Sequence, residues 1–104
     1  MVRGIYLANI VFTDRKASKI RPILVIKQNS YKDLIFLPLT TNLKTKGIEI
    51  DNDVLENGKL PQKSIVITEK ISVIAKNLII RKIATINKKQ FDIIVNNLCN
   101  FLKK

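Results

Sequence analysis

The sequence predicts a mainly β domain that ends in one α-helix, and two patterns predict it. Up to residue 86, short apolar runs rich in β-branched residues alternate with polar turns, which is typical of strands. After residue 86 the apolar residues take the spacing of an amphipathic helix. Strands followed by one packing helix indicate a small barrel or curled sheet with the helix against it. At 104 residues, the chain is expected to form a single domain over residues 1–104.

Polar or proline-containing breaks divide the β region into six expected strands. Pro22 opens the second strand and forces Arg21 towards an extended conformation. Pro38 marks the third as an edge strand or a strand end, because proline cannot donate to a β ladder. Residues 52–62 are expected to hold a short helical turn at most, because glycine and proline interrupt them. The strands are expected at Gly4–Phe12, Ile23–Lys27, Leu34–Leu39, Gly47–Asp51, Ser64–Val73 and Ile79–Ile86, with a turn over residues 74–78.

The predicted helix follows a stripe of apolar residues at positions i, i+3, i+4, i+7 and i+11. Asn87 can cap its N-terminus, and Gln90 three residues later completes a capping-box pattern. Lys103 and Lys104 lie at the end where the helix dipole favours cations. Cys99 lies next to the stripe and is interpreted as an inert, small apolar residue. The stripe consists of Phe91, Ile94, Val95, Leu98 and Leu102.

The net charge of +11 is the strongest signal in the composition. Nineteen Lys and Arg stand against eight Asp and Glu, an excess that attracts nucleic acid, an anionic membrane surface or an acidic protein partner. A second interpretation stays open, because 15 of the 19 basic residues are lysine and the chain is also rich in Ile and Asn. An AT-rich coding sequence would give that mixture, with lysine as ordinary surface cover.

The composition also excludes several kinds of chemistry. With no histidine and one cysteine, the chain has no His-dependent triad, no internal disulfide and no cysteine metal cluster. The acidic residues of the 49–56 stretch lack the glycine and terminal acid of a calcium loop, so we expect no metal and no cofactor. The apolar stretch from Ile5 to Phe12 is far shorter than the roughly 20 residues of a membrane span and carries no cleavage pattern. We therefore expect a cytoplasmic protein that does not enter the membrane.

Two islands are more specific than generic barrel sequence. Arg21–Ile26 (RPILVI) opens an apolar strand with an Arg-Pro dipeptide, and Leu37–Asn42 (LPLTTN) delivers two hydroxyls and an amide to a loop. GIYLANI precedes them, and SIVITEKI, IRKIATI and the terminal helix follow them. In this order and spacing, from Gly4 to the last helix, the chain resembles the MazF/PemK (Kid-like) family, the toxins of bacterial type II toxin–antitoxin systems.

The resemblance implies a small SH3-like barrel of the CcdB/PemK type that works as a homodimer. It further implies metal-independent, sequence-selective cleavage of single-stranded RNA through a 2′,3′-cyclic phosphate, and neutralisation by a cognate acidic antitoxin. In the family, the arginine of the Arg-Pro motif and the threonine of the Pro-Leu-Thr motif form the catalytic pair. Residue by residue, these fall on Arg21 and Thr40.

These residue types suit the reaction that the resemblance implies. When the 2′-hydroxyl attacks the neighbouring phosphate, charge builds on the phosphoryl oxygens, and a guanidinium can donate two hydrogen bonds to them. Arg21 fits that role but is a poor proton carrier, while Thr40 is expected to orient the phosphate or relay a proton through water. The structural alternatives are that Arg21 covers a barrel edge or pairs with an acid, and that Thr40 satisfies turn backbone.

Six further residues are candidate RNA contacts. Thr41 stands where the family often has Ser, and Lys70 replaces a residue that can read a base edge, since Glu69–Ser72 stands where many members have Asp-Gln-Ile-Arg. Ser72 removes an arginine, for which Arg81 is a candidate replacement. The basic loop among the six is either an RNA-backbone contact or an ordinary solvent-facing loop. The candidates are Arg15, Lys16, Lys19, Thr41, Asn42 and Lys70.

Other departures from the family pattern leave alternative functions open. Ile5 follows Gly4 where the family usually has an acid, and residues 14–20 lack the glycines and glutamate of the family's first loop. One alternative is a member that binds RNA or an antitoxin-like peptide without cutting. Another is a toxin that binds a protein target such as DNA gyrase, as CcdB does, although this chain ends in a polar tail without a terminal aromatic anchor.

Overall fold

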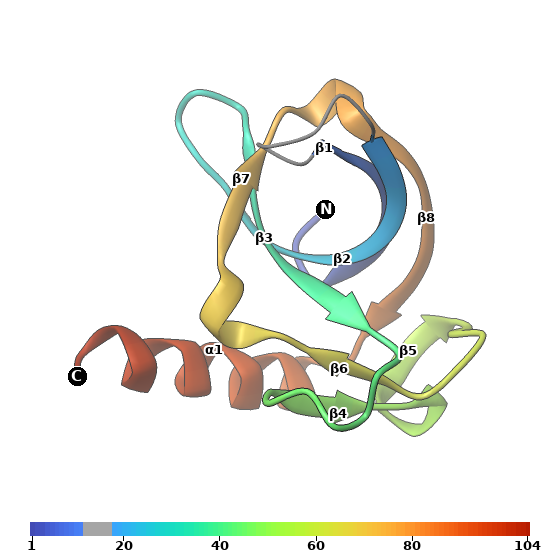
Figure 1. The fold of residues 1–104 in the computed structure, drawn as a ribbon, viewed down its shortest axis with the longest axis vertical. Coiled ribbons are helices and arrows are strands. Elements are labelled where there is room, and N and C mark those ends of the chain that lie inside the picture. Colours follow the sequence, from blue (N-terminus) through green and yellow to red (C-terminus); the bar gives the residue numbers. More distant parts are fainter. Residues whose placement is uncertain (12–17) are drawn as a thin grey trace.

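A computed structural model describes residues 1–11 and 18–104 of the chain and confirms the predicted fold class, mainly β with one C-terminal helix. The strands form a curled antiparallel sheet, with the helix running beneath it (Figure 1). The strands are β1 Gly4–Val11, β2 Ser18–Gln28, β3 Leu34–Thr40, β4 Ile48–Ile50, β5 Leu55–Gly58, β6 Ser64–Val66, β7 Ser72–Ile74 and β8 Ile79–Ile86. Three 3₁₀ turns, η1 Asn52–Val54, η2 Thr68–Lys70 and η3 Lys76–Leu78, connect them, and the helix is α1 Lys88–Leu102.

Both faces of the sheet are buried in its central strands, which explains their nearly continuous apolar sequence. The strands follow the order β4-β6-β3-β2-β1-β8-β5, and β7 pairs with β3. Because side chains alternate along a strand, neighbours enter different core clusters: Ile5 and Leu24 belong to the cluster that includes α1. Tyr6 and Val25 belong to a second cluster on the other face. The curl of the sheet encloses this second cluster within the barrel.

The helix α1 packs on the first cluster through Ile94 and Leu98, which are almost completely buried. The predicted N-cap is confirmed, because Asn87 Oδ1 accepts from the backbone N–H of Gln90 at 2.8 Å. The reciprocal half of the capping box is absent, since the Asn87 N–H donates instead to the Val54 carbonyl at 2.8 Å. The stripe stops short of its predicted end, because Leu102 is 59% exposed. Cys99 is also exposed, so it does not act as a small core residue.

The interpretation of Pro38 as a sign of an edge strand is wrong, although the pairing with β2 does end at this residue. β3 pairs with β2 along one side, and along the other it pairs first with β7 and then with β6. Pro38 lies at the changeover, where its carbonyl accepts from the Ile67 N–H at 2.9 Å. N–H and C=O of one strand residue point to the same side, so the missing proline N–H faces this gap in the ladder and no ladder bond is lost.

Three other expected elements are corrected. The predicted strand 64–73 is divided into β6, η2 and β7, because its two ends pair with different parts of β3. β5 was not predicted: Gly58, at φ +79°, lets this short strand end against β8. β2 begins at Ser18 instead of Ile23, because its polar first residues pair with the end of β1. Phe12 lies outside the described residues.

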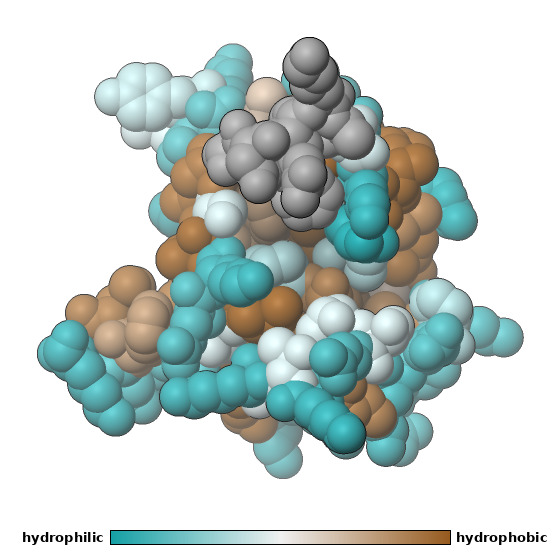
Figure 2. All heavy atoms as spheres, viewed as in Figure 1, coloured by the Kyte–Doolittle hydropathy of each residue, from teal (hydrophilic) through white to brown (hydrophobic). Residues whose placement is uncertain are grey.

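Figure 2 shows brown apolar side chains gathered over the barrel strands and hydrophilic side chains on the rim. An apolar tip is visible at the C-terminal end of α1, on the left of the view. Phe101 and Leu102, the last two residues of α1, are 40% and 59% exposed. No helix in the described parts of the chain is long and apolar enough to cross a membrane.

Replacing each of two buried threonines by valine should change the stability in opposite directions. Thr85 Oγ1 is buried and has no partner among the described residues, whereas the Thr68 hydroxyl donates to Asn97 Oδ1 at 2.7 Å. Thr85→Val should therefore raise the free energy of unfolding by about 1 kcal/mol, since it removes an unpaired buried polar atom. Thr68→Val should lower it by about 1–2 kcal/mol, because it breaks a buried hydrogen bond.

Urea denaturation followed by circular dichroism measures both changes, with the exposed Thr41→Val as the control expected to stay within about 0.5 kcal/mol of the parent. A loss of stability in Thr85→Val would contradict the assignment of an unpaired hydroxyl.

Candidate functional site

The pairing of β2 with β3 brings Arg21 and Thr40 to neighbouring ends of the two strands. The antiparallel register runs through Val25–Phe36, Leu24–Leu37 and Ile23–Pro38 and ends there. Arg21 and Thr40 each lie two residues beyond this last pair, on the face that carries Ile23, because side chains alternate along a strand. No ladder pairs join β2 and β3 beyond Pro38, which leaves room between these two strand ends.

A cavity of about 340 Å³ occupies this position. Arg21 and Thr40 line it together with Lys70, so the structure brings three of the sequence-predicted site residues to one place. The remaining wall is mainly apolar and comes from β1, β3 and the η2 region. Its residues are Ile10, Phe36, Pro38, Leu39, Ile67 and Ser72.

Lys70 reaches the cavity because the chain opposite β3 contains extra residues. Phe36 pairs with Ser72, and Leu39 pairs with Val66, so a step of three residues along β3 faces a step of six along the other chain. The surplus of three residues forms η2, Thr68–Lys70. Its last residue is held by a hydrogen bond from the Lys70 N–H to the Ile67 carbonyl at 3.2 Å. η2 therefore fixes where the Lys70 backbone stands relative to Arg21 and Thr40.

The charge in this cavity is positive. Arg21 and Lys70 line it, and none of its lining residues is a carboxylate. The nearest acid in sequence, Glu69, is held outside by Lys46, whose Nζ lies 3.1 Å from Glu69 Oε2. Neither Arg21 nor Lys70 pairs with a carboxylate of the described residues. Two cations on a partly apolar wall form a site suited to an anion.

Two hydroxyls in the cavity already make local hydrogen bonds. Thr40 Oγ1 accepts from the Asn42 N–H at 3.2 Å, so the predicted turn-satisfying role of Thr40 is present alongside its place on the cavity wall. Ser72 donates to the Lys70 carbonyl at 3.1 Å and tightens the end of η2. The Thr40 hydroxyl hydrogen remains available, because its bond to Asn42 uses an oxygen lone pair.

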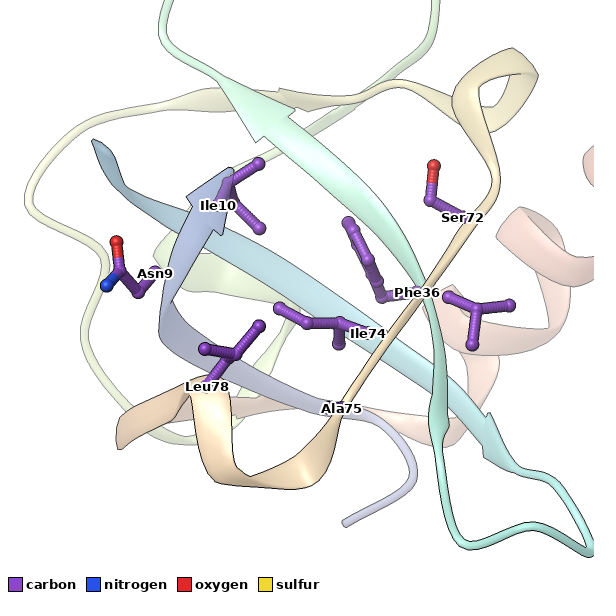
Figure 3. A pocket seen from close by; sticks show the side chains of 8 residues that line it. Asn9, Ile10, Phe36, Ser72, Ile74, Ala75 and Leu78 are labelled. Carbon is purple, nitrogen blue, oxygen red and sulfur yellow. The ribbon is translucent and has the colours of Figure 1, made fainter. Parts of the chain in front are cut away.

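A second cavity of about 380 Å³ continues from the first. The two share Ile10, Phe36 and Ser72, so they form one continuous groove. Figure 3 shows the side chains of Ile10, Phe36, Ile74 and Leu78 pointing toward one another into this second cavity, whereas the Asn9 side chain points away. The groove therefore has a cationic end at Arg21 and Lys70 and an apolar end at Leu78.

The other predicted site residues lie elsewhere. Arg15 and Lys16 fall outside the described residues. Lys19, Thr41 and Asn42 are exposed but do not line the cavity, and Asn42 Oδ1 caps the turn by accepting from the Lys44 N–H at 3.1 Å.

Arg81 does not compensate for Ser72, because it lies in a different cleft with Leu7 and Lys59. The acidic residues that we rejected as a calcium site are engaged locally: Glu49 with Lys63, Glu56 with Arg3, and Asp51 as the cap of η1.

Sequence reasoning missed the apolar part of the groove. Ile10, Phe36 and Ile67 belong to runs that read as ordinary core, and no local signal separates a cavity wall from a packed interior. Burial raises the pKa of the Tyr6 phenol, which keeps it neutral to alkaline pH, and Tyr6 does not line the groove. Within residues 1–11 and 18–104, no group of three or more His, Cys, Asp or Glu side chains is arranged to hold a metal ion.

Comparison with known proteins identifies the family and the fold of the chain. The profile of the PemK-like, MazF-like toxins of type II toxin-antitoxin systems matches residues 2–102. The chain belongs to this family, and it is a MazF-type toxin of a toxin–antitoxin system. No curated protein sequence matches the chain significantly.

Two solved structures illustrate the shared fold. Mycobacterium tuberculosis toxin MazF-mt6 is similar with a TM-score of 0.73 and 22% sequence identity, over 97% of this chain and 97% of that one. MazF from Deinococcus radiodurans is similar with a TM-score of 0.70 and 16% identity, over 99% of this chain and 96% of that one. At these identities the likeness establishes the fold, and the chemistry of the cavity has to be argued from its own residues.

The charge of the cavity predicts anion binding. Titration with inorganic pyrophosphate should shift the backbone amide signals of Ile10 and Phe36 in a ¹H–¹⁵N spectrum. Arg21→Ala and Lys70→Met should each weaken that binding about tenfold, since each removes one charge-assisted interaction. Lys89→Met, an exposed cation at the start of α1, is the matched control and should leave the affinity unchanged. Equal weakening by all three variants would show only general attraction to a basic protein.

Proposed function

We propose that this toxin cleaves single-stranded RNA at the Arg21–Thr40–Lys70 cavity, without a metal cofactor, and leaves 2′,3′-cyclic phosphate ends. The observation that carries the proposal is that Arg21, Thr40 and Lys70 line one cavity whose wall contains no carboxylate. Two cations and a hydroxyl suit a phosphodiester, and they match no arrangement that binds catalytic metal ions, which require carboxylate or imidazole ligands. Membership of the toxin family supports this choice of reaction class.

In the proposed reaction the 2′-oxygen attacks phosphorus and the bond from phosphorus to the 5′-oxygen breaks. The proton of the 2′-hydroxyl passes to water, directly or through the Thr40 hydroxyl. Arg21 donates to the non-bridging oxygens, whose negative charge grows in the transition state. Because a guanidinium holds its protons too tightly to act as an acid, Arg21 contributes charge and hydrogen bonds and transfers no proton.

Lys70 is the group that we assign to the leaving 5′-oxygen. Its ammonium is the cation of the cavity wall that can release a proton, since a guanidinium does so far less readily. It gives a proton to the 5′-oxygen as the bond breaks and regains one from water, so that no charge is left on the product alcohol. Lys70 then performs the acid step in a cavity without histidine or carboxylate.

The neighbouring apolar cavity favours an unpaired strand as substrate. An unstacked base can enter the groove and lie against Phe36 and Leu78, while its phosphate remains beside Arg21. A base held in a duplex is not free to do so. Single-stranded RNA is therefore the proposed substrate. The proposed place of action is the cytoplasm.

The partners that we propose follow from charge and family. An acidic antitoxin tail is expected to occupy the same cationic groove, so that it and RNA exclude each other. The active assembly is proposed to be a homodimer, as the family implies.

Loss of Arg21 should abolish most of the activity. Purified protein incubated with a long single-stranded RNA in EDTA is expected to give discrete fragments with 2′,3′-cyclic phosphate and 5′-hydroxyl ends. Arg21→Ala should lower the cleavage rate about 100- to 1,000-fold, the usual effect of removing one transition-state donor. Arg81→Ala, an arginine of a separate cleft, should stay within twofold of the parent. Intact RNA over a range of sequences, with folded protein, would reject the ribonuclease proposal.

A substrate with sulfur in place of the bridging 5′-oxygen tests the role of Lys70. A thiolate leaves without a proton, so this substrate needs no acid. The Lys70→Met protein should cleave ordinary RNA about 100-fold or more slowly than the parent. It should cleave the thio substrate at close to the parent rate. Arg21→Ala should be slow on both substrates. If Lys70→Met is equally slow on both, Lys70 contributes charge and not a proton.

One observation favours a second candidate function, the binding of a protein target such as DNA gyrase without RNA cleavage. Phe101 and Leu102 form an exposed apolar tip on α1, and such side chains are common at protein interfaces. Under this alternative the RNA stays intact in the assay above, and Phe101→Ser removes toxicity where Arg21→Ala does not.

A further inference from the structure

The three side chains of η2 make contacts in three different places. Lys70 lines the cationic cavity. Glu69 pairs with Lys46 of the loop before β4 at 3.1 Å, and Thr68 bonds to a residue of α1. The turn lies between β6 and β7 and against the helix (Figure 1). The place of Lys70 in the cavity therefore depends on what holds η2 against the rest of the fold.

The turn η2 has few contacts of its own that keep it in place. It is a single 3₁₀ turn of three residues, its N-cap makes no side-chain hydrogen bond, and the hydrogen bonds of such turns are poorly aligned. A cavity of about 290 Å³ is lined by Thr68 and Glu69 on one side and by the last two turns of α1 on the other. Because this space is open, close packing does not fix the turn from the side of the helix.

One hydrogen bond joins η2 to the helix. The Thr68 hydroxyl, in a residue that is 3% exposed, donates to Asn97 Oδ1 at 2.7 Å. Among the described residues, no other hydrogen bond joins two uncharged side chains. Burial of the donor excludes water as a competing partner, which makes the bond stronger than an exposed one. It therefore sets the distance between η2 and α1.

Asn97 is well placed to anchor the turn, because its own helix is fixed in the core. Counted from Ile94, Asn97 falls at i+3 and Leu98 at i+4, positions that share one face of a helix. Ile94 and Leu98 are buried in the first core cluster. Asn97 is thus a polar residue between two core positions, and its backbone moves only if that packing is lost.

The other side-chain contact of η2 is a weaker support. The ion pair between Lys46 and Glu69 joins side chains that are 87% and 40% exposed. Ion pairs this exposed to solvent contribute little, since water and salt screen them. The bond between Thr68 and Asn97 is therefore the main side-chain support of η2.

We propose that Asn97 is a positioning residue for the candidate site, because its bond to Thr68 holds η2 where the Lys70 side chain lines the cavity with Arg21. Without this bond, η2 can move into the 290 Å³ space beside α1 and carry Lys70 with it. Arg21 belongs to β2 and stays in place. Asn97 lines no part of the groove itself. This role deepens the proposed function and rests on it where RNA cleavage is concerned.

A double-mutant cycle with inorganic pyrophosphate tests the position of Lys70 without RNA cleavage. Lys70→Met should weaken binding about tenfold in the parent but less than threefold in the Asn97→Ala background, where Lys70 is already displaced. Asn97→Ala alone should weaken it about fivefold. Thr68→Ser keeps the hydroxyl and should bind like the parent.

Asn100→Ala is the matched control, because Asn100 lines the same space beside η2 and makes no hydrogen bond to a described side chain. This variant should leave both the affinity and the tenfold effect of Lys70→Met unchanged. A full tenfold effect of Lys70→Met in the Asn97→Ala background would overturn the proposal. Absence of pyrophosphate binding by the parent would overturn it as well, since no anion site would then exist for Lys70 to join.

The substrate with sulfur at the bridging 5′-position tests the same role during cleavage. Asn97→Ala should raise the ratio of the thio rate to the ordinary rate at least fivefold, because only the ordinary substrate needs the proton of Lys70. Lys70→Met/Asn97→Ala should be no slower on ordinary RNA than Lys70→Met. A general loosening of the fold would slow both substrates equally, and an unchanged ratio would contradict the assignment. A parent that leaves RNA intact would reject the proposed function, and the pyrophosphate cycle would still decide the role of Asn97.

Discussion

The change of partner along β3 is the constraint on which the candidate site depends. β3 pairs with β2 along one side, while its other side pairs with β7 at one end and β6 at the other. The two pairings are out of step by three residues, and those residues form η2. Pro38 stands at the gap, where a residue without an N–H costs no ladder bond, and its carbonyl holds Ile67. Lys70 stands at the end of η2, beside the cavity that Arg21 and Thr40 line.

The same sheet supplies two surfaces with different chemistry. Beside β3 and η2, cations and hydroxyls lead into an apolar groove, an arrangement suited to a phosphate with a base beside it. Along β1 and β8, three cations line a separate cleft without hydroxyl or aromatic side chains. The net charge of +11 therefore bears on ligand binding only at some places on the surface. These are the cavity walls that several cations line and no carboxylate does. Elsewhere in the described chain, two lysines each pair with one acid, Lys46 with Glu69 and Lys63 with Glu49.

The separation of these two surfaces explains what two departures from the family pattern do in the structure. Ser72, where many family members have arginine, closes the end of η2 by donating to the Lys70 carbonyl. Arg81 does not replace the arginine that other family members have at the position of Ser72, because Arg81 lies in the other cleft. Lys70 is then the second cation of the cavity, and a chain without histidine retains one lining group that can carry a proton.

The sequence by itself determined the class of fold, the bounds of β8, the N-cap of α1 and the extended conformation of Arg21. These are local properties, set by periodicity, capping and the residue that precedes a proline. Tertiary structure decided that residues 64–73 form two strands and not one, that β5 exists, and that the helix stripe leaves Leu102 exposed. It also decided that Arg21 lines the same cavity as Thr40, nineteen positions further along the chain, and that Arg81 stands in a different cleft. Strand register depends on pairing between distant segments, and a shift of one residue would turn every side chain to the other face, so no local pattern could have fixed it.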